Sequence, residues 1–330
     1  MWKTIARRFL IMIPQLFVLS IFIFILAQFM PGDPFSGLIT PQTDPNRIEE
    51  LRELAGLNDP VYVQYWNWIV NMFQGDFGDS YTFKVSVASL IGDRGVNTLW
   101  LSLLSVFLVY LIAIPLGVIA GRYQNSLKDK TIVLYSFISY AIPTFVLGLI
   151  FVYVFGYKLQ WFPTSGTKDV EEKAGTLGYY WSIIYHLLLP AITYAVLGTT
   201  AIIQYLRSEI IDAQLQDYVK TARSKGIPMK KVYSRHIFRN SLLPIAAFLG
   251  FTITGLLGGS FFIETIFGYP GMGKLFIDSI MARDYSVITT LIMLYGFLTL
   301  LGSLLSDIIL SIVDPRIRIE KTTKILEKEG

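Results

Sequence analysis

Six long runs without a charged side chain divide the chain. They cover residues 9–30, 95–121, 131–157, 174–206, 240–263 and 285–306. An α-helix rises about 1.5 Å per residue, so roughly 20 residues cross the ~30 Å hydrocarbon layer of a bilayer. Because a helix also satisfies its own backbone hydrogen bonds in lipid, the pattern predicts six transmembrane helices. The fourth run begins with glycines and paired tyrosines, so we expect its helix nearer 183–206.

The composition supports an all-α integral membrane protein. Hydrophobic residues make up 53% of the chain and charged residues only 16%, whereas soluble domains are about a quarter charged. The net charge of +4 comes from clusters between the apolar runs, which argues against a nucleic-acid partner. The chain has no cysteine, so disulfides, thiolate nucleophiles and zinc-thiolate or iron–sulfur sites are excluded.

Basic residues are distributed unequally between the two sets of connecting segments. Of the 28 Lys and Arg residues, 19 lie before the first run, between the second and third, in the segment 207–241, or after the sixth. Lys and Arg near helix ends are retained in the cytoplasm, so we expect both termini and the 207–241 loop to be cytoplasmic. The first run exceeds the h-region of a signal peptide and lacks a small-x-small cleavage site, which favours an uncleaved anchor.

These assignments divide the chain into four parts: a cytoplasmic N-terminus with the first helix (1–30), an external segment (31–94), a transmembrane core (95–320) and a cytoplasmic tail (321–330). The external segment contains two candidate helices. One begins at Asp44 and ends at Gly56, and the next follows Pro60. Apolar residues recur at helical spacing in the second helix: Val61, Tyr65, Trp68 and Met72. We interpret this as a helix at the headgroup layer, the alternative being a lid over an outer pore.

The sequence of the loop 207–241 predicts two helices separated by a break. Gly226 suits a left-handed helix end, and Pro228 precedes a second helix. Apolar positions predict one stripe before the glycine and another after it: Ile211, Leu215, Tyr218 and Ala222, then Met229, Val232 and His236. Such a ridge could insert into a groove on a partner, although basic loops of this kind also bind anionic lipid, and spacing alone leaves both open.

The segment DYVKTARSKG at 217–226 resembles the coupling loop of ABC importer permeases, in the dipeptide, oligopeptide and nickel branch. Five further segments resemble this branch in the same order along the chain: MPGDP at 30–34, GLNDPVYVQY at 56–65, GDFG at 75–78, ETIFGYPGMG at 264–273 and DPR at 314–316. The long external segment resembles the first of the branch's two permease types. One departure is that Lys220 and Thr221 replace the Glu-Ala of the wider family motif, which leaves the role of Lys220 open.

The resemblance implies a type I ABC importer permease in a prokaryotic cell membrane. Its partners would be a second homologous permease, two ATP-binding subunits, an extracellular substrate-binding protein and membrane lipid. ATP and magnesium would be bound by the ATPase subunits, and this chain would be non-catalytic, without a cofactor or metal. The residues expected to sit in the ATPase groove are Asp217, Tyr218, Thr221, Ala222 and Gly226.

One motif imitates a nucleotide site. The segment GYPGMGK at 268–274 has the spacing of a phosphate-binding loop, but Leu275 stands where a hydroxyl must reach magnesium. We interpret the segment as a Gly/Pro-rich turn, so ATP hydrolysis must come from a partner.

Few charges lie near the spans. We expect Asp307 and Glu264 to be hydrated residues at helix ends rather than parts of a proton relay. His186 and His236 fall on opposite sides of the predicted membrane and cannot share a metal.

The sequence thus predicts half of a translocation path for short peptides. The alternatives are a permease for nickel or another small solute and an ion-coupled secondary transporter, which the scarcity of charge in the spans disfavours. Pro115 and Pro143 lie inside predicted spans and either bend them or are simply tolerated. Six polar residues of the predicted spans are candidates to line the translocation path, and the sequence does not distinguish among them: Gln28, Gln204, Thr199, Thr200, Thr252 and Thr254.

Overall fold

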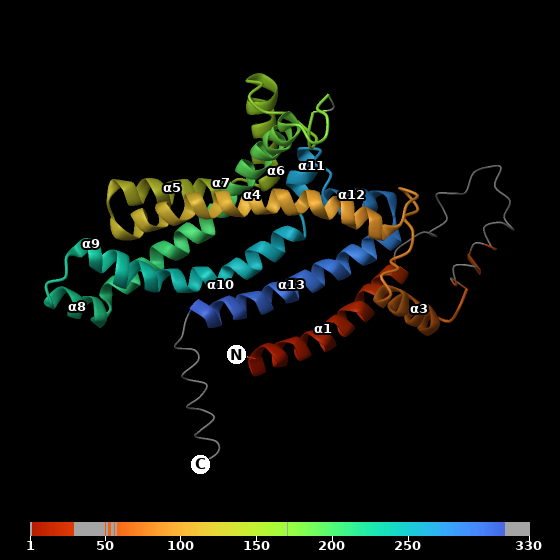
Figure 1. Ribbon diagram of the computed structural model, residues 1–330, viewed down its shortest axis with the longest axis horizontal. Coiled ribbons are helices and arrows are strands. Elements are labelled where there is room, and N and C mark those ends of the chain that lie inside the picture. Colours follow the sequence, from red (N-terminus) through yellow and green to blue (C-terminus); the bar gives the residue numbers. More distant parts are fainter. Residues whose placement is uncertain are drawn as a thin grey trace, which may run out of the picture.

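The protein is an all-helical bundle in a computed structural model that describes residues 2–29, 50, 52–53, 56, 58–169 and 171–313. The long helices lie roughly along one axis, and a shorter group around α6 and α11 rises to one side (Figure 1). The elements are α1 (Trp2–Phe29), α3 (Val61–Phe73), α4 (Val87–Arg122), α5 (Leu127–Ala141), α6 (Thr144–Phe151), η2 (Val152–Lys158), α7 (Leu177–Leu215), α8 (Asp217–Ser224), α9 (Met229–Val232), η3 (Tyr233–Ile237), α10 (Phe238–Leu257), α11 (Phe261–Ile266), α12 (Met272–Ala282) and α13 (Tyr285–Val313).

The six predicted spans correspond to four continuous helices and two bent pairs. By length and composition, α1, α4, α7 and α13 can each cross a membrane. Of the two alternatives for Pro143, the bend is confirmed in the third span, because α5 and the segment Thr144–Lys158 meet at 99°. Pro143 stands at this break as the residue that precedes α6. A proline cannot donate the backbone hydrogen bond that would continue α5, so here it interrupts the span.

The fourth span is longer than predicted at both ends. It begins at Leu177 rather than near residue 183, because the Thr176 hydroxyl accepts a hydrogen bond from the backbone N–H of Tyr179 and caps the helix. The helix then continues to Leu215 without a break at Pro190. With 39 residues it is about 58 Å long, so it extends well beyond the hydrocarbon layer.

Small residues bring the central helices close together. A Cβ atom at Gly121 of α4 would lie 2.8 Å from Ile210 of α7, and one at Gly117 would lie 3.0 Å from Leu206. The pair α10 and α13 is equally close, since a Cβ at Gly250 would lie 2.4 Å from the backbone nitrogen of Ser306. Small residues at such contacts are typical of helix packing in membranes, where no hydrophobic force brings helices together. The first helix packs at the edge of the bundle, beside α13 (Figure 1).

The predicted helix after Pro60 is confirmed as α3. Its Tyr65 hydroxyl lies 2.8 Å from the Ser20 hydroxyl of α1, and the Tyr65 and Trp68 rings pack against Phe24. The face that carries these two aromatic residues therefore rests on α1, whereas Trp66 on another face is exposed. Of the helix expected between Asp44 and Gly56, only residues 50, 52–53 and 56 are described, and Gly56 has the positive φ (+66°) of a helix end. The segments 30–34 and 314–330 lie outside the described residues.

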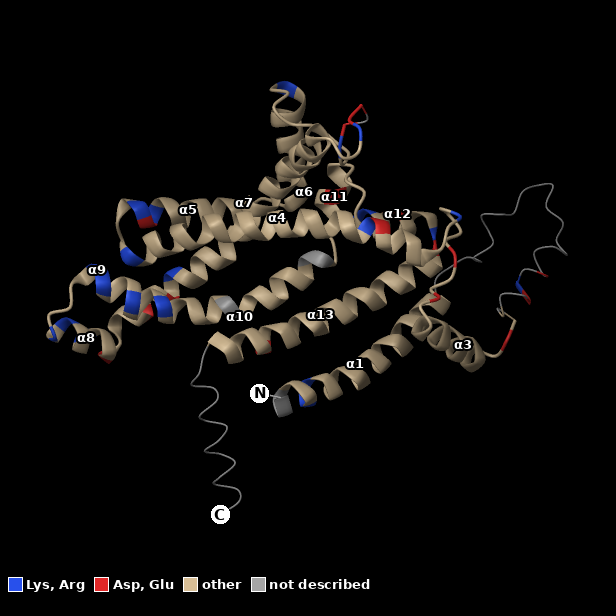
Figure 2. Cartoon of the chain, in the orientation of Figure 1, with Lys and Arg blue, Asp and Glu red and all other residues tan. Residues whose placement is uncertain are grey.

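Basic side chains gather at one end of the bundle. Figure 2 shows them around α8, α9 and the start of α5, with fewer at the opposite end near α3 and α12. The end that carries α8 and α9 is called the basic end below.

Candidate functional site

A helical projection extends from the basic end of the bundle, between α7 and α10 (Figure 1). It consists of α8, α9 and η3, joined to α7 through the single residue Gln216, whose extended backbone (ψ 149°) ends that helix. The four-residue stripe expected before the glycine is therefore wrong, because Ile211 and Leu215 belong to α7 and the other two members to α8. Leu215 is 69% exposed while Ala222 is 4% exposed, so the two do not share a face.

The turn after α8 confirms the left-handed helix end expected at Gly226, whose φ is +71°. Its backbone N–H donates to the carbonyl of Arg223 (2.9 Å), and the N–H of Ile227 donates to the carbonyl of Ala222 (3.2 Å). This pair of bonds is the Schellman motif, which satisfies the last carbonyls of a helix and fixes the direction of the chain beyond it. No atom lies within 4 Å of a Cβ built at Gly226, so the glycine is required by backbone conformation and not by crowding.

The projection has a buried base and an exposed ridge. Val219 and Ala222 of α8 are buried in one apolar cluster with Val232 and Ile237. On the other side of α8, three residues of the expected ATPase-coupling set are exposed: Asp217, Tyr218 and Thr221. Because the base is packed, the ridge is held as a rigid surface.

Lys220, whose role the sequence left open, pairs with Asp217 one turn earlier on α8. Its ammonium lies 2.9 Å from the carboxylate, and the two side chains are 68% and 93% exposed. The hydrogen bond from Lys220 lowers the pKa of Asp217 below its ordinary value. Being exposed, the pair contributes little to stability, and its charges remain available to a partner surface.

Hydrogen bonds tie the projection to the bundle. The Tyr233 hydroxyl of η3 donates to the Gln214 side chain (2.9 Å), which in turn donates to the backbone carbonyl of Gly121 (3.0 Å). The Ser241 hydroxyl of α10 donates to the carbonyl of Glu209 on α7 (3.1 Å). These bonds connect α4, α7, η3 and α10 at the point where the projection begins.

A buried ion pair braces the same end. Nε and Nη2 of Arg207 on α7 donate to the two carboxylate oxygens of Asp129 on α5, at 2.6 and 2.9 Å. The Asp129 side chain is 3% exposed, and its carboxylate also accepts the backbone N–H of Asn125 (2.8 Å). Such a bidentate pair fixes the orientation of both helices.

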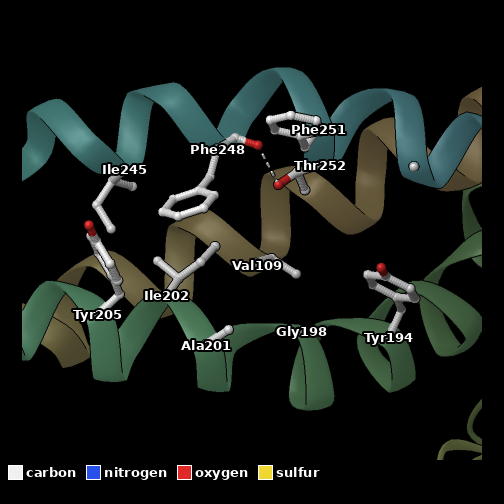
Figure 3. A pocket seen from close by; sticks show the side chains of 11 residues that line it. Val109, Tyr194, Gly198, Ala201, Ile202, Tyr205, Ile245, Phe248, Phe251 and Thr252 are labelled. Carbon is white, nitrogen blue, oxygen red and sulfur yellow. Dashed lines mark hydrogen bonds between the residues drawn. The ribbon is translucent and has the colours of Figure 1, made fainter. Parts of the chain in front are cut away.

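A cavity of about 370 Å³ lies between α4, α7 and α10. Figure 3 shows Tyr194, Ala201 and Tyr205 of α7 facing Phe248 and Thr252 of α10 across it. The rings of Tyr205 and Phe248 meet edge to face, with centroids 5.2 Å apart. Thr252 is the only residue of the candidate path set among those that line this cavity.

At the opposite end, Glu264 of α11 is completely buried, so the expectation of a hydrated carboxylate there is wrong. Its oxygens accept hydrogen bonds from the Thr98 hydroxyl (3.1 Å) and from the backbone N–H groups of Ser260 (3.3 Å) and Lys274 (2.9 Å). Lys274 lies at the start of α12, where free N–H groups favour an anion. The segment that imitates a phosphate-binding loop thus holds a carboxylate of its own chain.

Two family models match this chain. Residues 1–102 match the N-terminal model of the binding-protein-dependent transport system membrane components, and residues 113–319 match the model described as the binding-protein-dependent transport system inner membrane component. The chain belongs to this family of membrane permeases. It is therefore a non-catalytic, membrane-embedded permease subunit of an ABC importer.

Related proteins match this permease over nearly its whole length. It is 42% identical to the oligopeptide transport system permease protein AppB of Bacillus subtilis, over 95% of this chain and 98% of that one. It is 32% identical to the glutathione transport system permease protein GsiC of Escherichia coli K12, over 96% and 99%. Among solved structures, the inward-facing MetNI methionine ABC transporter matches 68% of this chain and 96% of its own, with a TM-score of 0.55 and 16% identity. That match shows a shared fold.

Asp307 and His186 of the permease have local partners. Asp307 of α13 is partly exposed and pairs with Arg8 of α1, whose Nε lies 2.8 Å from its carboxylate. Nδ1 of His186 donates to the backbone carbonyl of Ser182, one turn earlier on α7 (2.8 Å), while His236 lies in η3. Most other members of the candidate path set bond within the protein: Thr199 to Val196, Thr254 to Gly250, and Gln28 to Gln64.

Sequence reasoning missed the aromatic cavity of the permease, the Glu264 cluster and the Arg207–Asp129 pair. Each joins residues that are far apart in the chain. Arg207 and Asp129 were visible as charges at the ends of neighbouring spans, which is the signal that could have suggested their pairing. Nothing in the sequence pattern distinguishes Tyr194 from the other aromatic residues of its span.

Proposed function

We propose that this permease forms half of the path by which a bacterial ABC importer takes up short peptides. The observation that carries the proposal is the identity to an oligopeptide permease protein over 95% of the chain. A second relative is named as a glutathione permease, and glutathione is itself a tripeptide. Both names favour peptides over nickel as cargo.

The other half of the path is supplied by a second, homologous permease. Two ATPase subunits bind ATP and magnesium, and an extracellular binding protein delivers the peptide. The accumulation of Lys and Arg at the basic end supports a cytoplasmic position for α8 and α9, and with it cytoplasmic termini (Figure 2).

The ridge of the projection is the proposed contact with the ATPase. Asp217, Tyr218 and Thr221 are exposed and enter the groove of that subunit. Gly226 holds the turn that orients the ridge, and Ala222, being 4% exposed, supports it from beneath rather than touching the partner. The packed base lets α8 move as a rigid body when ATP closes the ATPase subunits.

Uptake by the purified complex, reconstituted into proteoliposomes, tests the cargo and the energy source. Labelled tri-alanine should accumulate when ATP is supplied, with or without ionophores that remove ion gradients. Labelled nickel should not accumulate. Peptide uptake that stops when the gradient is removed, despite ATP, would refute the proposal.

Gly226→Val tests the projection. Valine disfavours a left-handed backbone by roughly 1–2 kcal/mol, so the end of α8 should be distorted and ATP hydrolysis uncoupled from uptake. Gly226→Asn should retain most transport, because asparagine tolerates this conformation. Gly175→Val is a matched control, since Gly175 also has a positive φ (+88°) and open space around its Cβ but lies in the loop before α7. Equal uptake by both valine variants would contradict the assignment.

A further inference from the structure

The cavity between α4, α7 and α10 combines aromatic walls with hydroxyl groups. Tyr194 and Tyr205 come from α7, and Phe248, Phe251 and Thr252 come from α10 (Figure 3). Its volume of about 370 Å³ falls within the range of ligand pockets, which hold a small apolar group surrounded by a few polar atoms. The cavity is therefore large enough for a single bulky amino-acid side chain.

A second hollow on α4 provides a comparison. It has a volume of about 420 Å³ and is lined by residues such as Phe107, Leu111 and Leu249, with one hydroxyl residue, Tyr110. An almost wholly apolar hollow of this kind suits a lipid acyl chain. The cavity on α7 and α10 differs because three residues around it bear hydroxyls: Tyr194, Tyr205 and Thr252.

The position of the cavity also relates it to transport. Its two aromatic walls belong to α7, which leads directly into the projection, and to α10, which leads directly out of it. A movement of α8 would therefore be transmitted to both walls of the cavity. A transported cargo must first be bound and then released, so a binding site whose walls are linked to the projection suits it. A lipid acyl chain requires no such link.

We propose that this cavity receives an apolar or aromatic side chain of the peptide cargo and so contributes to the selectivity of the permease. The inference rests on the proposed function in peptide import. The rings of Tyr194, Phe248 and Phe251 contact the cargo side chain, and the hydroxyl of Tyr194 is available to the peptide backbone. A pocket of this kind discriminates side chains by size, on the order of tenfold for a large change in fit.

Filling the cavity tests the proposal. Ala201 is exposed, and its methyl group points into the cavity (Figure 3), so Ala201→Phe occupies the space that a cargo side chain would need. Leu249→Phe, in the second hollow, is the matched control. The measurement is the ratio of Ala-Phe-Ala uptake to Ala-Ala-Ala uptake in proteoliposomes with the same binding protein. Because that protein is unchanged, its own preference cancels when each variant is compared with the unmodified permease.

The ratio should fall roughly tenfold in Ala201→Phe and stay unchanged in Leu249→Phe. An unchanged ratio in Ala201→Phe, or an equal fall in both variants, would overturn the inference. If the unmodified complex imports neither peptide, it is the proposed function that fails.

A second measurement needs no variant. A tripeptide with benzoylphenylalanine at its centre should, after illumination of the working complex, label residues 194–205 or 245–255. Labelling confined to other segments, or blocked by added phospholipid instead of by unlabelled peptide, would assign the cavity to another occupant and overturn the proposal.

Discussion

Removing the Glu264 carboxylate should destabilise the end of the bundle opposite the projection. The side chain is fully buried and accepts hydrogen bonds from Thr98, Ser260 and Lys274. In Glu264→Ala these three donors lose their acceptor inside the protein. Each buried donor without a partner costs about 1–3 kcal/mol, so the total loss for three donors is on the order of 3–9 kcal/mol. That loss is a large share of the free energy of unfolding of a typical folded protein, which is about 5–15 kcal/mol.

Glu264→Gln has nearly the same shape and should show an intermediate effect. An amide offers one acceptor oxygen in place of two, and its NH₂ group would face a backbone N–H donor. The assay is the fraction of purified complex that remains monodisperse after heating through a temperature series. Asp278→Ala is the control, since Asp278 is a half-exposed partner of Lys274 in the same helix and its ion pair contributes little.

The expected order of thermal stability is the unmodified complex and Asp278→Ala highest, then Glu264→Gln, then Glu264→Ala. A Glu264→Ala complex as stable as the control would refute the view that the carboxylate organises this end. A Glu264→Gln complex that is fully stable but cannot transport would instead indicate a proton relay, the role that the hydrogen-bond geometry disfavours.

Arg207→Met should destabilise the complex in thermal denaturation by about 3–5 kcal/mol, because it leaves Asp129 buried and unpaired, and adding Asp129→Asn should recover part of that loss. Gly271→Ala should mimic Glu264→Ala in the heating assay, because the new Cβ would lie 2.4 Å from a carboxylate oxygen of Glu264; normal stability would contradict this. As the chain has no cysteine, Ser224→Cys should react with a membrane-impermeant maleimide only in inverted vesicles, whereas Lys173→Cys should react in intact cells.

Much of the fold could be predicted because local pattern determines it. The apolar runs located the spans, since the requirement for about 20 uncharged residues is a property of the bilayer. Gly226 was predictable for a similar reason, because the left-handed conformation that ends α8 is a local preference of glycine. The same is true of Pro60, which fixes the start of α3.

The features that escaped prediction depend on contacts between distant segments. Glu264 follows a span, as a hydrated residue would, and only the proximity of Thr98 and of the turn before α12 makes it a buried acceptor. Ala222 lies on the predicted stripe, but its burial results from packing against Val232 and Ile237 beyond the turn. Pro143 was visible in the sequence, yet the 99° angle is set by how α6 packs against α7 and α11.

The imitation of a phosphate-binding loop has a physical explanation in this structure. Close approach of backbone N–H groups to an anion requires glycine, whether the anion is a phosphate or a carboxylate. Side chains at Gly271 or Gly273 would lie 2.4 or 3.1 Å from Glu264. The interpretation of this segment as a Gly/Pro-rich turn did not include the carboxylate of Glu264, which lies against these glycines.

The proposed coupling surface and the cargo cavity are connected by short segments that are held by helical structure and hydrogen bonds. Between the ridge on α8 and the aromatic wall on α7 there is one extended residue, Gln216, and then a continuous helix. On the other side, η3 passes directly into α10, and Ser241 bonds that helix to α7. A displacement of α8 by the ATPase would thus reach Tyr205 and Phe248 without being absorbed in a flexible loop. These two rings are in contact across the cavity. The movement that couples ATP hydrolysis to transport would therefore also change how tightly the cavity binds the cargo.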